Sequence, residues 1–254
     1  MSVNNWTRHE LILAFNLYCR IPFGRLHKGN PEIISLAQNI GRTSSAVAMK
    51  LVNFASFDPV HQERQISGLK NASRADREIW NEFNANSEQL AFESQQALQN
   101  LTNEKTIIEE TEIELPTGET EKTRLVRTRL VQSFFRDAVL SSYEFKCAIC
   151  NLDLPELLSA SHIIPWSKNV ARRADPRNGL SLCAIHDRAF DRGLLSLNDS
   201  FEVLLAERIK SNTSKNSLQS TAFLEMEGKS ITLPKRFTPD REALSYHREN
   251  IFRG

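Results

Sequence analysis

The sequence predicts an α+β fold, in which a helical N-terminal domain and a linker precede a C-terminal domain of short strands and helices. Apolar residues recur with a helical period from Trp6 to about Phe83. Beyond residue 130, two pairs of metal-ligand residues can pin both ends of a short segment, and a strand pattern follows at 201–205. We therefore expect domains that end near residues 83, 130 and 254.

Composition and charge limit the classes of protein to which this chain can belong. The 254 residues can bury a sizeable core, and 32 basic against 31 acidic residues give a formal net charge of +1. Any attraction to nucleic acid must therefore come from local basic faces. The polar start has no signal-peptide core and only four cysteines occur, so we expect a cytoplasmic protein. No apolar run approaches the roughly 18 residues that span a bilayer, which excludes membrane insertion.

Two short helices around a glycine turn are expected in the N-terminal domain. The first covers about 32–39 and ends at Gly41, where a positive φ suits glycine. Thr43 or Ser44 can cap the second helix, which covers about 45–54. Helix, turn and helix in this order predict a helix-turn-helix, a motif that binds DNA or mediates protein contacts.

A polar stretch separates the two domains. Residues 84–100 are rich in Asn, Gln and Ser, with sparse apolar positions, which indicates a linking helix. Residues 107–115 and 122–130 have the pattern of two strands around a Pro-Thr-Gly turn, so we expect a projecting β-hairpin. Further helices are expected at 131–143 and 241–252, where apolar residues return at helical spacing.

Cysteine and histidine occur at metal-ligand spacing in the C-terminal domain. Cys147 and Cys150 are separated by two residues, as are Cys183 and His186, and two such pairs can close a tetrahedral zinc site. Alternatively, His186 binds a catalytic metal, but that would leave the tetrahedron open, and we favour zinc. Cys19 is expected to be a core residue of a helix.

Three further motifs accompany the cysteine pairs in the segment 147–197. They are Ser161-His162-Ile163, Asn178-Gly179-Leu180 and Phe190-Asp191. In this order the segment resembles the HNH endonucleases, also called ββα-metal nucleases. The resemblance implies a zinc-stapled ββα-metal domain that hydrolyses phosphodiester bonds. The N-terminal helices more weakly resemble regions joined to HNH modules in predicted restriction enzymes.

The resemblance also assigns roles to single residues. His162 would be the general base, and Asn178 would hold the loop that aims it. Asp187 and Asp191 share a helix face and would hold a catalytic cation, Mg²⁺ or Mn²⁺. Ser161 stands where an acidic residue or a histidine often precedes the base, and it is a poor metal ligand. The alternatives are a zinc ligand or a buried structural histidine for His162, an ordinary Asn-Gly turn for Asn178, and a solvated acidic face for the two aspartates.

Basic and short polar side chains are candidates for contact with DNA. Those that begin the second helix of the helix-turn-helix could reach the backbone or base edges, and those in the loop after the histidine could grip phosphates. Solvated charge is the alternative for the loop. The candidates are Arg42, Ser44, Ser45, Lys50, Lys168, Arg172, Arg173 and Arg177.

Together these features predict a metal-dependent endonuclease for double-stranded DNA, with a structural Zn²⁺. The resemblance implies that it acts in restriction or in defence against foreign DNA. Cutting both strands needs two active sites or two visits, so we expect a homodimer. The rival hypothesis is a DNA-binding regulator whose HNH module is a non-cleaving zinc scaffold. A homing or repair nuclease would differ in target and not in chemistry.

Overall fold

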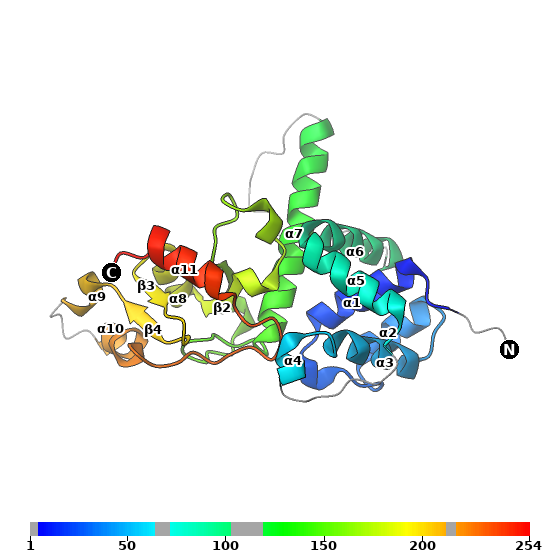
Figure 1. The fold of residues 1–254 in the computed structure, drawn as a ribbon, viewed down its shortest axis with the longest axis horizontal. Coiled ribbons are helices and arrows are strands. Elements are labelled where there is room, and N and C mark those ends of the chain that lie inside the picture. Colours follow the sequence, from blue (N-terminus) through cyan, green and yellow to red (C-terminus); the bar gives the residue numbers. More distant parts are fainter. Residues whose placement is uncertain (1–4, 64–71, 103–118, 212–216) are drawn as a thin grey trace. The chain divides into compact units, whose positions relative to one another are not determined.

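The computed structural model describes residues 5–63, 72–102, 119–211 and 217–254. The chain divides into two compact units, Met1–Asp137 and Ala138–Gly254 (Figure 1). The helical unit contains α1 Arg8–Arg20, a 3-10 turn at Phe23–Arg25, α2 Pro31–Asn39, α3 Ser44–Ala55, α4 Pro59–Glu63, α5 Arg74–Ala85, α6 Ser87–Thr102 and most of α7 Glu119–Ser142.

Helix α1 forms the core of the helical unit. It contacts α3, α5 and α6, and every residue from Leu11 to Cys19 is buried. Its start is fixed by a capping box, in which Thr7 and Glu10 satisfy each other's backbone N–H groups. The ring of Phe15 lies 5.2 Å from that of Phe54 and 4.9 Å from that of Phe83, measured between centroids. Aromatic packing around α1 therefore joins the helices of this unit.

The predicted helix pair before and after Gly41 is present as α2 and α3. Asn30 caps α2, since its side chain accepts a hydrogen bond from the backbone of Glu32 at 2.8 Å. Gly41 has φ +66°, and Thr43 caps α3 by accepting from Ala46 at 3.2 Å. The two helices contact each other. The two helices and the glycine between them are thus as the sequence predicts.

Helix α6 packs within the helical unit, although the sequence predicted a linking helix there. Leu90 and Ala91 are buried, and Ser94 accepts a hydrogen bond from Asn16 of α1 at 3.0 Å. Because α6 contacts both α1 and α5, the division of the chain falls after Asp137 and not near residue 83. Small residues of α6 let it pack closely against α1, and a search for large apolar residues does not detect such a contact.

The second strand of the predicted β-hairpin is wrong. Residues 122–130 lie inside α7, which runs without Pro or Gly from Glu119 to Ser142. Leu130, Phe134 and Ala138 follow one another at i+4 and are all buried, so a helical face begins before the predicted strand ends. The other predicted strand, 107–115, lies outside the described residues.

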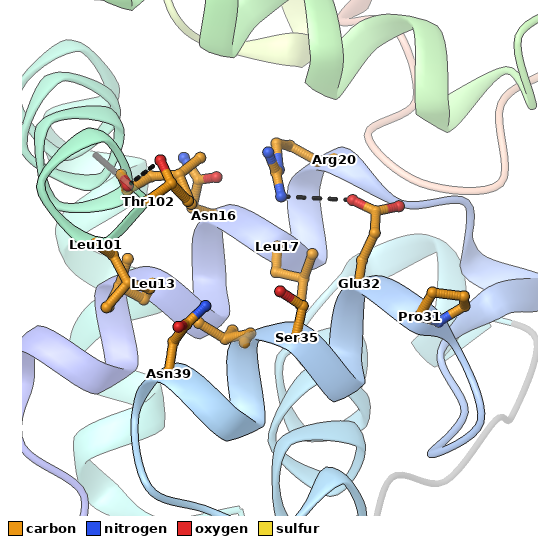
Figure 2. A pocket seen from close by; sticks show the side chains of 12 residues that line it. Leu13, Asn16, Leu17, Arg20, Pro31, Glu32, Ser35, Asn39, Leu101 and Thr102 are labelled. Carbon is orange, nitrogen blue, oxygen red and sulfur yellow. Dashed lines mark hydrogen bonds and ion pairs between the residues drawn. The ribbon is translucent and has the colours of Figure 1, made fainter. Parts of the chain in front are cut away.

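A cavity of about 360 Å³ lies between α1, α2 and α6 in the helical unit (Figure 2). Leu13 and Leu17 line it together with Arg20, whose guanidinium is 3.4 Å from the carboxylate of Glu32. Asn16 also lines it and is 1% exposed. The cavity therefore combines apolar walls with one ion pair.

The second unit is built on a ββα arrangement. Strands β1 Leu158–His162 and β2 Gly179–Cys183 are antiparallel, with His162 opposite Gly179, and α8 Ala184–Asp191 packs on both strands. The remaining elements are 3-10 turns at Pro155–Leu157, Val170–Arg172, Pro176–Asn178 and Leu224–Met226, strands β3 Leu195–Leu197 and β4 Val203–Leu205, and helices α9 Glu207–Lys210, α10 Ser217–Ala222 and α11 Arg241–Asn250. The predicted strand at 201–205 and helix at 241–252 correspond to β4 and α11.

Helix α11 closes over the end of α8. The ring of His247 stacks on that of Phe190 with 3.7 Å between centroids and 13° between planes. Gly193 has φ +68°, and a Cβ there would lie 2.0 Å from the carbonyl oxygen of Ile251. Only glycine allows the C-terminal segment to approach this closely.

None of the helices in the described parts of the chain has the length and hydropathy of a membrane span.

Candidate functional site

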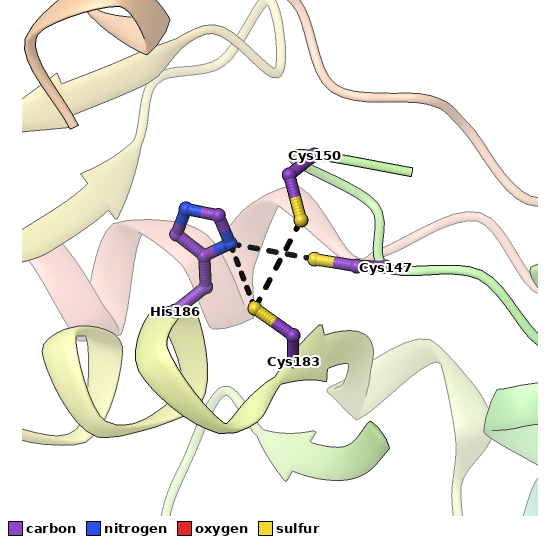
Figure 3. Close-up of side chains that lie close together, drawn as sticks. All are labelled: Cys147, Cys150, Cys183 and His186. Atoms are coloured by element: carbon purple, nitrogen blue, oxygen red, sulfur yellow. Dashed lines mark hydrogen bonds between the residues drawn. The ribbon is translucent and has the colours of Figure 1, made fainter. Parts of the chain in front are cut away.

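Four ligand atoms converge where the predicted zinc site was placed (Figure 3). Those of Cys147, Cys150, Cys183 and His186 all lie within 4.8 Å of one another. Nδ1 of His186 is 3.5 Å from Sγ of Cys147 and 3.2 Å from Sγ of Cys183, and the Sγ atoms of Cys150 and Cys183 are 3.9 Å apart. Zinc–sulfur bonds of about 2.3 Å and zinc–nitrogen bonds of about 2.0 Å place tetrahedral ligands about 3.5–3.8 Å apart. The four residues therefore fit a zinc ion.

The surroundings of His186 also suit a metal ligand. Its Nε2 lies 2.8 Å from the carbonyl oxygen of Ala222, so Nε2–H donates there and Nδ1 keeps its lone pair for the cluster. Neighbouring groups act on the thiols too: a hydrogen bond from Cys147 and the proximity of His186 lower the pKa of Cys183. A thiolate is the form that binds zinc. The alternative, in which His186 binds a catalytic metal, does not fit, because its ring lies among the three cysteines.

A cavity of about 320 Å³ lies beside the zinc cluster's helix and brings the predicted catalytic residues together. His162 enters it from β1, and Asp187 and Asp191 enter it from α8. Trp166 and, from α11, His247 complete much of the wall. Sequence reasoning missed His247, because its place in the cavity depends on α11 folding back over α8.

His162 has a defined orientation in this cavity. Its Nε2 lies 3.0 Å from the carbonyl oxygen of Arg173, so in the neutral ring Nε2–H donates to that oxygen and Nδ1 is the unprotonated nitrogen. Burial lowers the pKa of His162 below its ordinary value, and the bond to Arg173 only partly offsets this. The ring is therefore neutral at physiological pH and can accept a proton.

Asn178 ties together the loop that follows His162. The side chain is 1% exposed, and its Oδ1 accepts from the backbone N–H of Ile164 at 2.8 Å. Its Nδ2 donates to the carbonyls of Ile164 at 3.0 Å and Arg172 at 3.3 Å. These bonds join the two ends of the loop and thereby restrain the backbone next to His162.

Asp187 and Asp191 lie one helical turn apart on α8. Burial and the charge of Asp187 raise the pKa of Asp191, while Arg188 and Arg192 oppose this shift. Two carboxylates that repel each other in one cavity are suited to a divalent cation. Among the described residues, however, the group whose ligand atoms already converge is the zinc cluster.

Comparison with known families now identifies the segment. Residues 147–198 match the family model described as HNH endonuclease. This segment is an HNH domain. The match includes both cysteine pairs, His162, Asn178 and the two aspartates of α8, whereas His247 lies outside it. No curated protein matches the chain in sequence.

Three of the predicted DNA-contact arginines hold the loop of the HNH domain together. Arg172 pairs with Asp240, the N-cap of α11. Arg177 pairs with Asp175 at 2.9 Å. Arg173 donates from Nε to the carbonyl of Trp166 at 2.9 Å. Their charges are thus partly satisfied by the protein, whereas Lys168 in the same loop has an exposed side chain.

In the helical unit, Arg42 and Lys50 stabilise the fold. Arg42 binds Glu10 through two hydrogen bonds of 2.8 and 3.0 Å, and Lys50 lies 2.7 Å from buried Asp76. Their side chains are 11% and 9% exposed, so the predicted contact with DNA does not fit these two residues. The apolar pattern of α3 did not reveal that Lys50 is buried, because the aliphatic part of a lysine side chain can occupy a core-facing position. Ser45 is exposed and Ser44 half-buried at the start of α3.

Ser161 is the position at which the HNH domain departs from the expected ligand pattern. It is 3% exposed and lines the cavity next to His162. Its Oγ has no hydrogen-bond partner among the residues that the structure describes. A hydroxyl here is a weak ligand for a hard cation, so the aspartates of α8 are the stronger candidates.

Proposed function

We propose that this protein is a metal-dependent DNA endonuclease that hydrolyses phosphodiester bonds with its HNH domain. The observation that carries the proposal is the cavity that His162 lines together with Asp187 and Asp191. A neutral imidazole and a pair of carboxylates are the groups that such hydrolysis requires.

Each residue has a distinct part in the proposed reaction. His162 accepts through Nδ1 a proton from the water that attacks phosphorus. Asn178 keeps the loop next to the base in place. Asp187 and Asp191 would hold a divalent cation, Mg²⁺ or Mn²⁺, which offsets the charge that develops on the phosphate oxygens. The zinc cluster stabilises the domain and takes no part in the chemistry.

The proposed substrate is double-stranded DNA, and the proposed setting is restriction or defence against foreign DNA in the cytoplasm. The helix pair α2 and α3 would help to choose or hold the site, with Ser44 and Ser45 at the start of α3. Lys168 is the loop residue best exposed for a phosphate. A homodimer would let two active sites cut the two strands.

A plasmid-cleavage assay tests the proposal. The parent protein should nick or cut supercoiled DNA when Mg²⁺ or Mn²⁺ is present and remain inactive in chelator. His162→Ala should lower the rate constant by about 10²- to 10⁴-fold. His9→Ala changes an exposed histidine of α1 and should keep the parent's activity. Equal cleavage by the parent and His162→Ala would reject this assignment of the base.

A second candidate is a DNA-binding regulator that uses the HNH domain as a non-cleaving zinc scaffold. The observation that favours it is Ser161, which supplies no carboxylate or imidazole beside His162. Such a protein would bind DNA in a gel-shift assay and cleave it with none of the divalent cations tried.

A further inference from the structure

One face of α1 lines the cavity of the helical unit with both apolar and polar side chains (Figure 2). Its residues are spaced at i, i+3, i+4 and i+7, so they lie on the same side of the helix: Leu13, Asn16, Leu17 and Arg20. The cavity volume of about 360 Å³ falls in the range of ligand pockets and equals the space of about twelve water molecules in the liquid. A small organic molecule can therefore fit.

Two buried polar atoms of these side chains have no hydrogen-bond partner among the residues that the structure describes. They are Oδ1 of Asn16, which is an acceptor, and Nε of Arg20, which is a donor. The other end of the amide is satisfied, because Nδ2 of Asn16 donates to Oγ of Ser94 at 3.0 Å. Ser94 gives its own hydrogen to the carbonyl of Ala91, so it accepts from Asn16 and fixes which end of the amide is unpaired. A bound molecule with a donor and an acceptor would satisfy both atoms.

The charges around Arg20 disfavour a simple anion. Its guanidinium is 3.4 Å from the carboxylate of Glu32. A second carboxyl group, that of Asp137 on α7, is close enough to interact: burial raises the pKa of Asp137, and the charge of Arg20 opposes this rise. A ligand of net negative charge would be repelled by these acidic groups. A zwitterion would instead place its carboxylate on Arg20 and its ammonium near Glu32.

The rest of the cavity wall is largely aliphatic. Leu36 of α2 and both Leu98 and Leu101 of α6 line it together with the leucines of α1. Among the described residues that form the wall there is no aromatic ring, which disfavours a stacked nucleobase or another flat ring. An aliphatic group is the apolar part that this wall fits best.

We propose that this cavity is a binding site for a small zwitterion with an aliphatic side chain, of the class of the aliphatic α-amino acids. The carboxylate accepts from Nε of Arg20, the ammonium donates to Oδ1 of Asn16, and the side chain lies against the leucines. Residues one helical turn apart have Cβ atoms about 5–6 Å from each other, a gap that two charged groups on one carbon atom can bridge. The cavity lies outside the matched HNH segment, and the proposal does not depend on DNA cleavage.

Titration calorimetry on the full-length, zinc-bound protein tests the ligand class. L-Leucine should bind at one site per chain. 4-Methylpentanoate lacks the ammonium and 3-methylbutylamine lacks the carboxylate, and each should bind at least about tenfold more weakly, because each leaves a hydrogen bond between charged groups unmade. Glycine has no aliphatic side chain and should also bind more weakly than leucine.

Three variants locate the site. Arg20→Met removes the Nε donor, and Asn16→Leu removes the Oδ1 acceptor while Ser94 keeps its bond to a backbone carbonyl. Each should weaken leucine binding by about tenfold or more. Ser35→Phe, at an exposed position of α2 in the cavity wall, should weaken binding by narrowing the cavity while both polar groups remain. Arg25→Met changes an exposed arginine outside the wall and should keep the parent's Kd.

Several results would overturn the proposal. No heat of binding with leucine at about 20 mM would mean that the cavity holds water only. Equal affinity for leucine and 4-methylpentanoate would reject a zwitterion, and a Kd that none of the three variants changes would put the ligand elsewhere.

A measurement on the parent protein covers the case in which a variant fails to fold. In protein labelled with ¹³C at the leucine methyl groups, unlabelled leucine should shift the signals of Leu13, Leu17 and Leu101. Signals that stay constant would reject the site. None of these measurements uses DNA, so a failure of the proposed nuclease function and a failure of this site are separate results.

Discussion

Nε2 of His186 lies 2.8 Å from the carbonyl oxygen of Ala222, 36 positions along the chain. This bond directs Nδ1 of the ring toward three cysteine sulfur atoms. The acceptor is the last residue of α10, which lies outside the segment that matches the HNH family. The zinc cluster therefore depends on a support that its own motif does not include.

Removal of zinc should unfold the unit Ala138–Gly254, which contains the HNH segment. The purified protein should contain one zinc ion per chain by elemental analysis, and a strong chelator should abolish the folded spectrum of residues 138–254, because metal binding supplies much of the folding free energy of small zinc sites. Cys183→Ser should have the same effect. Cys19→Ala, at the buried cysteine of α1, should keep full zinc content. A stable domain in chelator would contradict a structural zinc.

Cleavage should remain fast below pH 6.5. Burial lowers the pKa of His162, so the base stays neutral at a pH where an exposed histidine is half protonated. As pH falls, the single-turnover rate should therefore decline with a midpoint below 6.5. The midpoint should not change with the concentration of a saturating divalent cation, which separates His162 from the metal ligands. A midpoint at or above 6.5 would count against His162 as the base.

Neutralising one carboxylate of α8 should abolish the response to divalent cation. The parent's melting temperature should rise when Mg²⁺ or Mn²⁺ is added, because the ion binds the folded state. Asp187→Asn should lose this rise, and it should also remove the charge that raises the pKa of Asp191. Without cation the variant should be as stable as the parent or slightly more so. Asp199→Asn, an exposed aspartate paired with Arg248, serves as the control.

The buried pair of Lys50 and Asp76 should be needed for the stability of the helical unit. The carboxylate of Asp76 is fully buried and also accepts from Asn53 at 2.9 Å. Asp76→Ala leaves the ammonium of Lys50 without this partner and should lower the free energy of unfolding by about 3–5 kcal/mol. Arg74→Ala breaks an exposed ion pair with Glu78 and should change the free energy of unfolding by less than about 0.5 kcal/mol. Urea unfolding measures both.

Stability should fall in acid partly through His247. Burial lowers its pKa to about 4, so the unfolded chain binds a proton at a higher pH than the folded chain does. The free energy of unfolding should begin to fall as the pH falls through 6.5, and this loss should be complete below about pH 4. It corresponds to about 3 kcal/mol. His247→Gln should remove this part of the pH dependence relative to the parent. An identical slope in both proteins would show that folding does not change the pKa of His247.

Local patterns carried much of the prediction. Capping residues and glycine located α2 and α3 because a helix end needs particular side chains within a few positions. The spacing of Cys147, Cys150, Cys183 and His186 indicated the metal cluster for a similar reason, since each pair must fit one turn. The failures were long-range. Residues 122–130 were predicted to be a strand next to a Pro-Thr-Gly turn, but they lie inside helix α7.

The chemistry of this protein was determined by its sequence: a ligand set for zinc, an imidazole, an amide and two carboxylates at fixed spacing. The tertiary structure decided which nitrogen of His162 bonds to the backbone, because the acceptor is the carbonyl of Arg173, a group that any residue could supply. It also decided that Arg42 and Lys50 pair with buried carboxylates, and that α11 brings His247 to the cavity. Such contacts join residues distant in sequence, and only the packing of the folded chain sets their distances.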